Sequence, residues 1–391
     1  MRFLLLQSSV YFPSYGGGNK SNRLLLETLA KRGHQCWSIS KSIDAQTVID
    51  KRSEQEVLNE RGIKITQYHQ NIRHYCHNKV EIFSFHSLTT QSLSEFIKLE
   101  YHKIKPDIIL VSDDKTGELL DVSLSVSVKK TVLVLHTNLH LPFGKEATSH
   151  SETRQQQYHR CPNILSSTQY TQHYLFNESG IECAYLPFPV FGEQQFNRLN
   201  MFQQGYIGMI NPCAIKGIAI FLTLAQAFPN LNFLAVPTWG ASDAEIAQLN
   251  AINNITLVEP KDDVGEILKQ LSILLVPSLI PETFGYVTVE AMLRGIPVLA
   301  SKLGGLIDAK LGTDYLLPVK PAINHNGNHY IPTQDSKPWI SVLERLSQDR
   351  QEYTRCSKSS YYAAHKYLSM ISITDFEHYF TNIKKANDVA A

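Results

Sequence analysis

The sequence predicts an α/β protein built from two doubly wound domains in series. Short apolar runs alternate with stretches of helical periodicity, an order typical of parallel sheets covered by helices. The same alternation restarts near residue 205, after a segment punctuated by Pro187 and Pro189. The chain of 391 residues is also longer than one core usually supports, and fits two domains of about 200 residues each.

The first domain is expected over residues 1–190. Its apolar runs predict strands at 2–7, 36–40, 108–111, 132–135 and 164–166, with a helix at 20–32. Gly33 stands where a left-handed cap would end that helix. The alternation of apolar and polar residues is weak over residues 50–80, and it predicts no strand or helix there.

The second domain is expected over residues 204–360, after a linker at about 187–203. Its predicted strands lie at 205–210, 232–236, 272–277 and 298–301, and its predicted helices at 217–227 and 286–294. From Lys337 to about residue 385 the pattern is helical and amphipathic. The chain is therefore expected to end in helices.

The composition excludes several classes of protein. Basic and acidic residues number 37 and 36, so no broad positive field favours nucleic acid as a partner. The apolar start at residues 1–7 is too short for a signal peptide, and no run reaches the 18 apolar residues of a membrane span. Six cysteines without a C-x-x-C pair indicate neither a disulfide framework nor a zinc ribbon. A soluble, cytoplasmic chain is expected, and contact with a membrane surface is not indicated.

The segment 277–292 passes from a buried strand into a helix, and it carries the clearest chemical signal. Ligands bind at the carboxyl ends of parallel strands. The helix is expected to begin near Gly285, which leaves the amides of Gly285, Tyr286 and Val287 available. Such amides, with the positive end of the helix dipole, predict a site for a pyrophosphate.

Two glutamates flank this predicted anion site. Glu290 lies about 6 Å along the helix axis from Tyr286, and its side chain leans back toward the helix start. Glu282 stands in the loop before the helix. Taken singly, each would be an ordinary exposed glutamate. Their spacing, with Phe284 and Gly285 between them, favours a loop that grips a sugar nucleotide from both sides.

This segment resembles the E-x7-E signature of retaining glycosyltransferases of family 4, in the form E-x-F-G-x-x-x-x-E-A-M followed by G-x-P-V. The resemblance covers residues 277–301. It implies the GT-B fold, in which two Rossmann-like domains face each other across a cleft. The C-terminal helical segment 361–391 is expected to return to the first domain.

The resemblance also implies roles for individual residues. Glu290 would hold the nucleotide ribose, and Glu282 would face the transferred sugar. Phe284 and Gly285 would supply backbone contacts to that sugar. Gly304 and Gly305 follow the last matched strand, and Asp308 stands where the family often has glutamate; these three positions receive no assigned role.

Three further positions match the family's pattern. Gly16, Gly17 and Gly18 follow the first strand, where a glycine-rich loop would close over the donor phosphates. His136 ends an apolar run and would lie near the donor sugar. Lys216, before Gly217, would neutralise the phosphates. The alternatives are a flexible loop, a structural histidine and a surface lysine, although a helix start is an unusual place for an unpartnered cation.

One departure from the family is visible. An arginine usually precedes the lysine by a few residues, whereas this chain has Met209-Ile210-Asn211-Pro212-Cys213. Phosphate neutralisation would therefore rest on fewer charges than in the family.

Other polar clusters receive weaker assignments. Asp113 and Asp114 favour an acceptor-side role or helix capping over a metal site, and Asn138 is a second acceptor-side candidate. The mixed stretch 68–77 lacks metal-ligand spacings. It favours a surface loop, with acceptor or membrane-surface contact as alternatives. No metal site is predicted.

Together these observations predict a metal-independent transfer of a hexose-type sugar, and the resemblance implies that the transfer retains the anomeric configuration. The donor would be a UDP- or GDP-linked sugar, no further cofactor would be needed, and the acceptor would be a hydroxyl of a glycan, a lipid-linked molecule or a small molecule. Glu282, His136 and Lys216 are the predicted catalytic residues. A nucleotide-sugar epimerase of the same fold and a catalytically silent binding partner are the alternatives.

Overall fold

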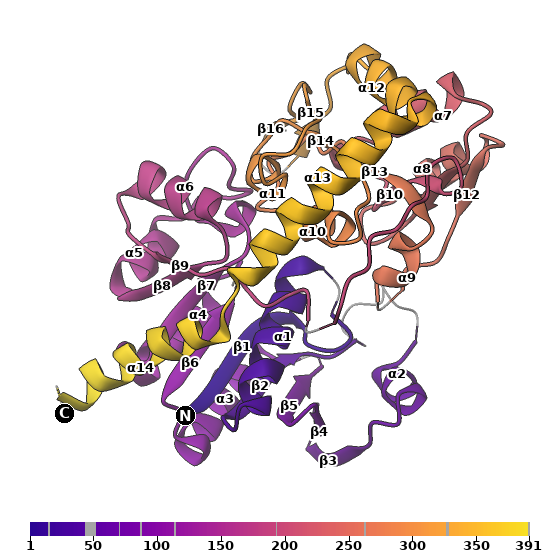
Figure 1. Cartoon of the computed structure of the whole chain (residues 1–391). Coiled ribbons are helices and arrows are strands. Elements are labelled where there is room, and N and C mark those ends of the chain that lie inside the picture. The colour runs from indigo at the N-terminus through magenta and orange to yellow at the C-terminus, as the bar shows by residue number, and fades with distance from the viewer. Residues whose placement is uncertain are drawn as a thin grey trace. The chain divides into compact units, whose positions relative to one another are not determined.

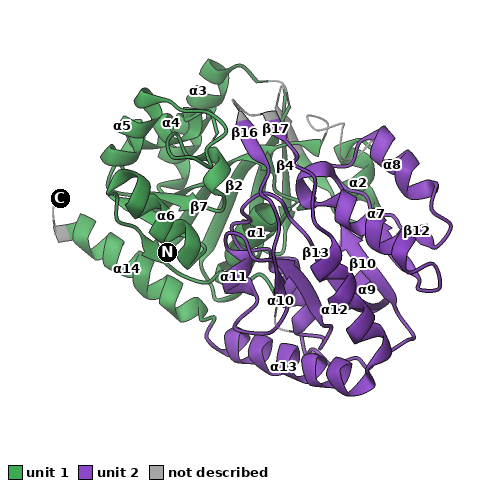
Figure 2. Ribbon diagram, turned by 90° about the horizontal axis from the view of Figure 1, so that it is seen from above, with its two compact units in different colours: residues 1–192, 371–391 green, residues 193–370 purple. Residues whose placement is uncertain are grey.

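A computed structural model describes residues 1–14, 16–43, 52–69, 71–86, 88–112, 115–192, 194–261, 263–325 and 328–389. The chain divides into two compact units, distinguished by colour in Figure 2. Unit 1 comprises Met1–Gly192 with Ile371–Ala391, and unit 2 comprises Glu193–Met370. Each unit is described by itself. No helix among the described residues is both long enough and apolar enough to cross a membrane.

Unit 1 is built on a nine-stranded sheet with the order β3-β4-β5-β2-β1-β6-β7-β8-β9. Its strands are β1 (Arg2–Val10), β2 (Gln35–Lys41), β3 (Ile65–His69), β4 (Ile72–His77), β5 (Val80–Phe85), β6 (Ile108–Ser112), β7 (Thr131–Leu135), β8 (Asn163–Ser166) and β9 (Ala184–Tyr185). Its helices are α1 (Gly17–Lys31), α2 (Glu54–Glu60), α3 (Thr90–Ile104), α4 (Glu118–Ser127), η2 (Asn138–His140), α5 (Glu152–Arg160), α6 (Gln169–Ser179) and α14 (Ile373–Val389).

The central strands of unit 1 follow the sequence pattern closely. β6 and β7 are buried along their whole length, as expected for strands of a parallel sheet covered on both faces. Helix α1 ends before Gly33, whose φ of 92° lies in the left-handed region, so the predicted cap is confirmed.

The expectation of a surface loop at residues 68–77 is wrong. Strand β3 pairs antiparallel with β4, and β4 pairs antiparallel with β5, so the sheet is mixed rather than purely parallel. Only two side chains of β4, Ile72 and Tyr75, are buried, which explains why the apolar pattern there is weak.

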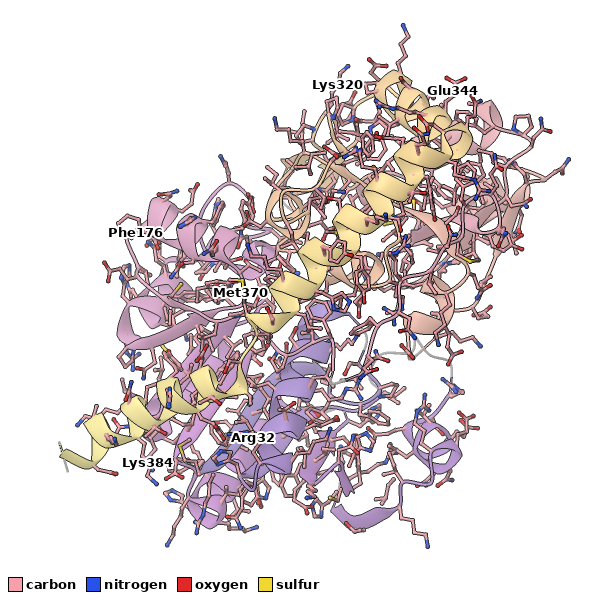
Figure 3. The ribbon with its side chains drawn as sticks, in the orientation of Figure 1. Arg32, Phe176, Lys320, Glu344, Met370 and Lys384 are labelled. Carbon is pink, nitrogen blue, oxygen red and sulfur yellow. The ribbon has the colours of Figure 1, made fainter. Side chains whose placement is uncertain are left out.

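The last helix, α14, packs within unit 1. The ring of Phe380 meets that of Phe3 edge-on at 5.1 Å between centroids. Glu377 accepts two hydrogen bonds from the Arg32 guanidinium, at 2.8 and 2.7 Å, and Lys384 Nζ lies 3.0 Å from an Asp107 carboxylate oxygen. In Figure 1, α14 is the yellow helix that leads to the C-terminus, and Arg32 and Lys384 are labelled in Figure 3.

The chain re-enters unit 1 at Ile371. The sequence placed that boundary at residue 361, but α13 (Arg350–Ser369) runs past it without a break. The sequence pattern between residues 350 and 369 does not mark the position at which the chain leaves unit 2, because α13 and α14 both carry an apolar face.

The Glu377 pair predicts an acid-dependent loss of stability. Hydrogen bonding from Arg32 lowers the pKa of Glu377 to about 2, below the value of about 4.3 expected in the unfolded chain. This stabilisation is present above the unfolded pKa and is lost as pH falls from about 5 to about 2. In Glu377→Gln, the melting temperature should be lower at pH 7 and should fall less steeply between pH 5 and 3 than in the wild type.

Because Arg32 is half-exposed, the effect should be modest. Glu344→Gln, at an exposed position of helix α12 (Lys337–Gln348) that is labelled in Figure 3, provides the matched control and should retain the wild-type profile. Identical acid profiles for the wild type and Glu377→Gln would show that the pair contributes nothing.

Unit 2 carries a six-stranded parallel sheet with the order β12-β11-β10-β13-β14-β15. Its strands are β10 (Tyr206–Ile210), β11 (Phe233–Val236), β12 (Ile255–Leu257), β13 (Leu271–Val276), β14 (Val298–Ser301) and β15 (Leu316–Leu317), followed by a hairpin of β16 (Ile323–His325) and β17 (Asn328–Tyr330). Its helices are η3 (Ala214–Lys216), α7 (Ile218–Ala227), α8 (Asp243–Asn250), α9 (Gly265–Leu268), α10 (Tyr286–Met292), α11 (Leu306–Ala309), α12 (Lys337–Gln348) and α13.

The strand order places a topological switch between β10 and β13. The chain runs from β10 to β11 in one direction along the sheet and from β13 to β14 in the other. In open α/β sheets, ligands bind outside the carboxyl ends of the strands at such a point. The loops that follow β10, β11, β13 and β14 all leave the sheet at this one edge. It is the edge at which most of the predicted site residues of the second domain stand.

Candidate functional site

The loop after β10 docks directly on the loop after β13. Leu279 N donates to the carbonyl oxygen of Ile215 at 2.9 Å. Gly217 has a φ of 85°, and a Cβ atom placed on it would lie 2.1 Å from the Pro277 carbonyl oxygen. Only glycine fits there, because both the backbone conformation and the space exclude a side chain. The fit holds the neighbouring Lys216 next to the loop after β13.

Lys216 and Glu282 form an ion pair between these two loops. The ammonium of Lys216 donates to the Glu282 carboxylate, and each side chain is 18% exposed. The structure therefore brings two of the three predicted catalytic residues together. A cation beside the start of a helix is unfavourable unless an anion lies next to it. In this structure the Glu282 carboxylate is that anion for Lys216.

The loop that carries Glu282 is supported by Gly304 and Gly305. Glu282 pairs with Gly304 as an isolated parallel bridge, and Gly305 N donates to the Glu282 carbonyl oxygen at 2.7 Å. A Cβ atom on Gly305 would lie 1.8 Å from the Thr283 carbonyl oxygen. The glycine pair that follows β14 is therefore a close backbone support for the Glu282 loop, a role that sequence reasoning did not assign.

Helix α10 begins at Tyr286, as predicted. Gly285 is its N-cap, with a φ of 82°, and no side chain caps the helix start. A Cβ atom on Gly285 would also lie 2.7 Å from Leu306, so space and conformation both require glycine. The predicted use of the amides at 285–287 by an anion stays a prediction.

Glu290 is buried, with 8% of its surface exposed, so it is not a solvated helix position. Its carbonyl oxygen accepts a hydrogen bond from Arg294 at 2.8 Å. The Arg294 guanidinium packs 4.9 Å from the Phe196 ring centroid. Burial lowers the pKa of Arg294, although the negative charges of Glu290 and Asp263 act to raise it. Glu290 thus belongs to a buried charged group of unit 2, and contact with a ribose stays a prediction.

The Phe284 side chain points into an aromatic cluster. Its ring lies 5.3 Å from that of Tyr286 and 5.6 Å from that of Tyr367 on α13. Phe284 is 5% exposed. The phenylalanine therefore anchors the loop through its ring, which leaves its backbone as the part that could contact a ligand.

Asn211, in the segment where the resembled family usually has arginine, has a structural role of its own. It adopts a φ of 58°, and its Oδ1 accepts a hydrogen bond from Gly240 N at 3.0 Å. A second bond, from Ala214 N to Glu245 Oε1 at 2.6 Å, joins the loop after β10 to the first turn of α8. The loop after β11 is thereby tied to the loop after β10. Sequence reasoning missed this link, since partners 29 and 31 residues apart leave no periodic signal.

In unit 1, the predicted glycine loop meets the predicted histidine. Gly16 is the N-cap of α1, while Gly17 and Gly18 form its first turn. A Cβ atom on Gly18 would lie 2.9 Å from His136 Cβ. The close packing of α1 on β7 therefore requires Gly18, independently of any phosphate.

His136 belongs to a buried polar network. Its Nε2 lies 2.8 Å from Asn22 Oδ1, and Asn22 Nδ2 donates to Ser112 Oγ at 2.7 Å. Burial lowers the pKa of His136 to about 3, so the imidazole is neutral at pH 7. Because Asn22 Oδ1 is an acceptor, Nε2 carries the proton. A neutral histidine can serve a substrate as a hydrogen-bonding group, but it is not a source of positive charge.

The two acceptor-side candidates have different outcomes. Asn138 is buried, donates to Glu146 at 2.9 Å and accepts from Thr171 Oγ1 at 2.8 Å. Both ends of its amide are therefore engaged within unit 1, which favours a structural role. Asp113 and its neighbour Asp114 lie outside the described residues.

Solved structures share the architecture over the whole chain. The sucrose-phosphate synthase from Thermosynechococcus elongatus has 15% sequence identity, covers 100% of both chains and superposes with a TM-score of 0.71. Anabaena HepE, solved in complex with UDP-glucose, has 14% identity, with 99% of this chain and 100% of that chain covered, and a TM-score of 0.66. The chain has the GT-B fold.

Within this GT-B chain, residues 203–349 match the family model described as glycosyl transferases group 1. A D-inositol 3-phosphate glycosyltransferase from Corynebacterium kroppenstedtii is 30% identical over 122 residues. That stretch is 31% of this chain and 24% of the relative, so the chain matches about a quarter of the relative's length. The matched family region contains the β10, β11, β13 and β14 loops described above.

Proposed function

We propose that this protein is a glycosyltransferase that moves a sugar from a nucleoside-diphosphate sugar to an acceptor hydroxyl. The observation that carries the proposal is the Lys216–Glu282 pair, which stands beside the glycine-capped start of α10. It combines a cation for phosphates with a carboxylate for sugar hydroxyls at the switch point of a parallel sheet. The match of residues 203–349 to glycosyl transferases group 1 supports it.

The finer assignment is a retaining transfer of a hexose-type sugar by a family 4 enzyme of the E-x7-E type. UDP-linked or GDP-linked sugars are the proposed donors, with no metal and no further cofactor. The resemblance of residues 277–301 supports this assignment. The acceptor is proposed only as a hydroxyl of a glycan, a lipid-linked molecule or a small molecule.

In this mechanism the protein acts mainly through fixed charges and dipoles. Lys216 and the amides at 285–287 would stabilise negative charge as the bond between sugar and diphosphate breaks. The acceptor oxygen would bond to the anomeric carbon on the same face, and its proton would pass to the leaving phosphate oxygen. Glu282 would hold sugar hydroxyls, and the neutral His136 would accept a hydrogen bond rather than donate a proton.

A thermal-shift panel of UDP-, GDP-, ADP- and dTDP-sugars tests the donor site. At least one of them should raise the melting temperature of the wild type, and the rise should be lost in Glu290→Ala. Because Glu290 is buried, Glu290→Gln is the more conservative companion variant, and its unliganded melting temperature reports folding. If no sugar nucleotide stabilises the wild type, or both variants respond as strongly as it does, the assigned site is wrong.

Product analysis separates transfer from the alternatives. Incubation of the stabilising donor with mixed sugar and lipid acceptors should give a glycosylated product and a free nucleoside diphosphate. An epimerised sugar nucleotide formed without acceptor would identify an epimerase instead. Binding without turnover of any donor would identify a silent partner.

A further inference from the structure

Trp239 is an exposed aromatic side chain at the carboxyl edge of the unit 2 sheet. It stands in the loop between β11 and α8, and it is 50% exposed. The other two tryptophans differ, since Trp339 is fully buried in the unit 2 core and Trp37 packs half-buried in unit 1. An exposed indole leaves a large apolar surface in water, so its position at this edge calls for a physical reason.

The indole lies beside the Lys216–Glu282 pair. Lys216 Nζ is 6.0 Å from the Trp239 ring centroid, and the same ammonium contacts the Glu282 carboxylate. The three groups therefore follow one another as aromatic ring, cation and carboxylate. At 6.0 Å the attraction between the cation and the ring is at the limit of its useful range, so it does not by itself account for the placement of the ring.

The backbone holds Trp239 in place although its side chain is exposed. The next residue, Gly240, is bonded through its amide to Asn211, and a Cβ atom on Gly240 would lie 2.8 Å from both Asn211 Oδ1 and Cys213 Sγ. Helix α8, which follows, is joined to the β10 loop by the Ala214–Glu245 bond. The loop is therefore fixed directly after the tryptophan and again at the start of α8, as expected for a preorganised contact surface.

We infer that Trp239 is a stacking platform for the sugar ring of the donor, an inference that rests on the proposed function. The C–H face of a pyranose is apolar and packs against an aromatic ring, while its hydroxyls hydrogen-bond to a carboxylate and its phosphate pairs with an ammonium. Trp239, Glu282 and Lys216 present these three partners in adjacent positions. A nucleobase could also stack on the ring and donate an N–H to the carboxylate, and the comparison of each sugar nucleotide with its nucleoside diphosphate separates the two ligand groups.

The test compares each sugar nucleotide with its own nucleoside diphosphate. Titration calorimetry of the full chain is run with UDP-glucose and UDP, GDP-mannose and GDP, and ADP-glucose and ADP. In Trp239→Ala, the dissociation constant of the bound sugar nucleotide should rise about tenfold, and that of the matching diphosphate should change less than about threefold. Trp239→Phe keeps an aromatic face and should recover most of the loss.

Tryptophan fluorescence gives an independent reading. Trp239 is the exposed tryptophan, so acrylamide should quench part of the wild-type emission, and that part should be absent in Trp239→Phe. The sugar nucleotide should shield this component, whereas the matching diphosphate should leave it accessible. Trp37→Phe is the control, because it removes an indole from unit 1 and should preserve the shielding.

Each contrary result has a distinct meaning. Equal losses for UDP and UDP-glucose would assign the ring to the nucleotide and overturn the inference. Unchanged affinities in Trp239→Ala, with the wild type still binding a sugar nucleotide, would also overturn it and leave the proposed function intact. Failure of every sugar nucleotide to bind the wild type would overturn both.

Discussion

A Lys216→Met variant is expected to lower kcat/KM for sugar transfer by about 100- to 1000-fold, the usual effect of removing one group that stabilises developing charge. Lys216 is the cation that the structure places against Glu282, at the sheet edge where the diphosphate is proposed to bind. Its loss would also leave the Glu282 carboxylate facing that diphosphate without a counter-charge. Steady-state kinetics with the donor found by the thermal-shift panel would measure the effect.

The double variant Lys216→Met/Glu282→Gln separates the two contributions. Removing the carboxylate should improve binding of the nucleoside diphosphate relative to Lys216→Met, because like charges no longer repel, while transfer stays low. Lys269→Met is the control for net charge, since Lys269 is exposed and lies at the opposite end of β13. If Lys216→Met retained wild-type kcat/KM, the proposed electrostatic role would be untenable.

A Gly305→Ala variant is expected to show the second large effect, a loss of about 3 kcal/mol of stability together with loss of donor binding. Gly305 has ordinary helical backbone angles, with a φ of −68°, so alanine is not excluded by conformation. The obstacle is space, because the new Cβ atom would lie 1.8 Å from the Thr283 carbonyl oxygen. Relieving that clash must move the loop that carries Glu282.

Chemical denaturation and calorimetry with the donor would measure both losses. Gly312→Ala is the matched control in the same unit. Gly312 has a φ of 76° and nothing within 4 Å of an added Cβ atom, so this variant reports backbone strain without a clash. It should cost about 1 kcal/mol and preserve donor binding. Normal binding by Gly305→Ala would show that the loop does not need its glycine support.

The regular part of the fold follows from the sequence because its signals are local. The buried strands β6, β7 and β14 are continuous apolar runs, and a run of that kind at a domain core can be identified without knowing its neighbours. The start of α10 was predictable for the same reason, since Gly285 and Gly295 lie within one short segment. The strands within residues 68–77 were not, because β4 buries only Ile72 and Tyr75 and its apolar pattern is therefore weak.

In the candidate site, too, single residues can be selected from the sequence, but the contacts between them cannot. Lys216 and Glu282 could each be selected from the sequence, but their ion pair joins loops 66 residues apart, and only the docking of Ile215 against Leu279 makes it. The roles of Asn211, Gly305 and Trp239 depend on atoms of other loops. No spacing within the sequence encodes such contacts, since they arise where separate strands end at one sheet edge.

By itself the sequence determined the α/β class, and it predicted the two-domain order and a candidate site in the segment from Glu282 to Glu290. Local periodicity and glycine placement are sufficient for these, because each reflects interactions among residues close in the chain. The tertiary structure alone decided that Lys216 meets Glu282, that His136 is buried and neutral, and that the chain re-enters unit 1 at Ile371. Each of these depends on distant segments coming together, where burial and close packing set the charge, contacts and position of a side chain.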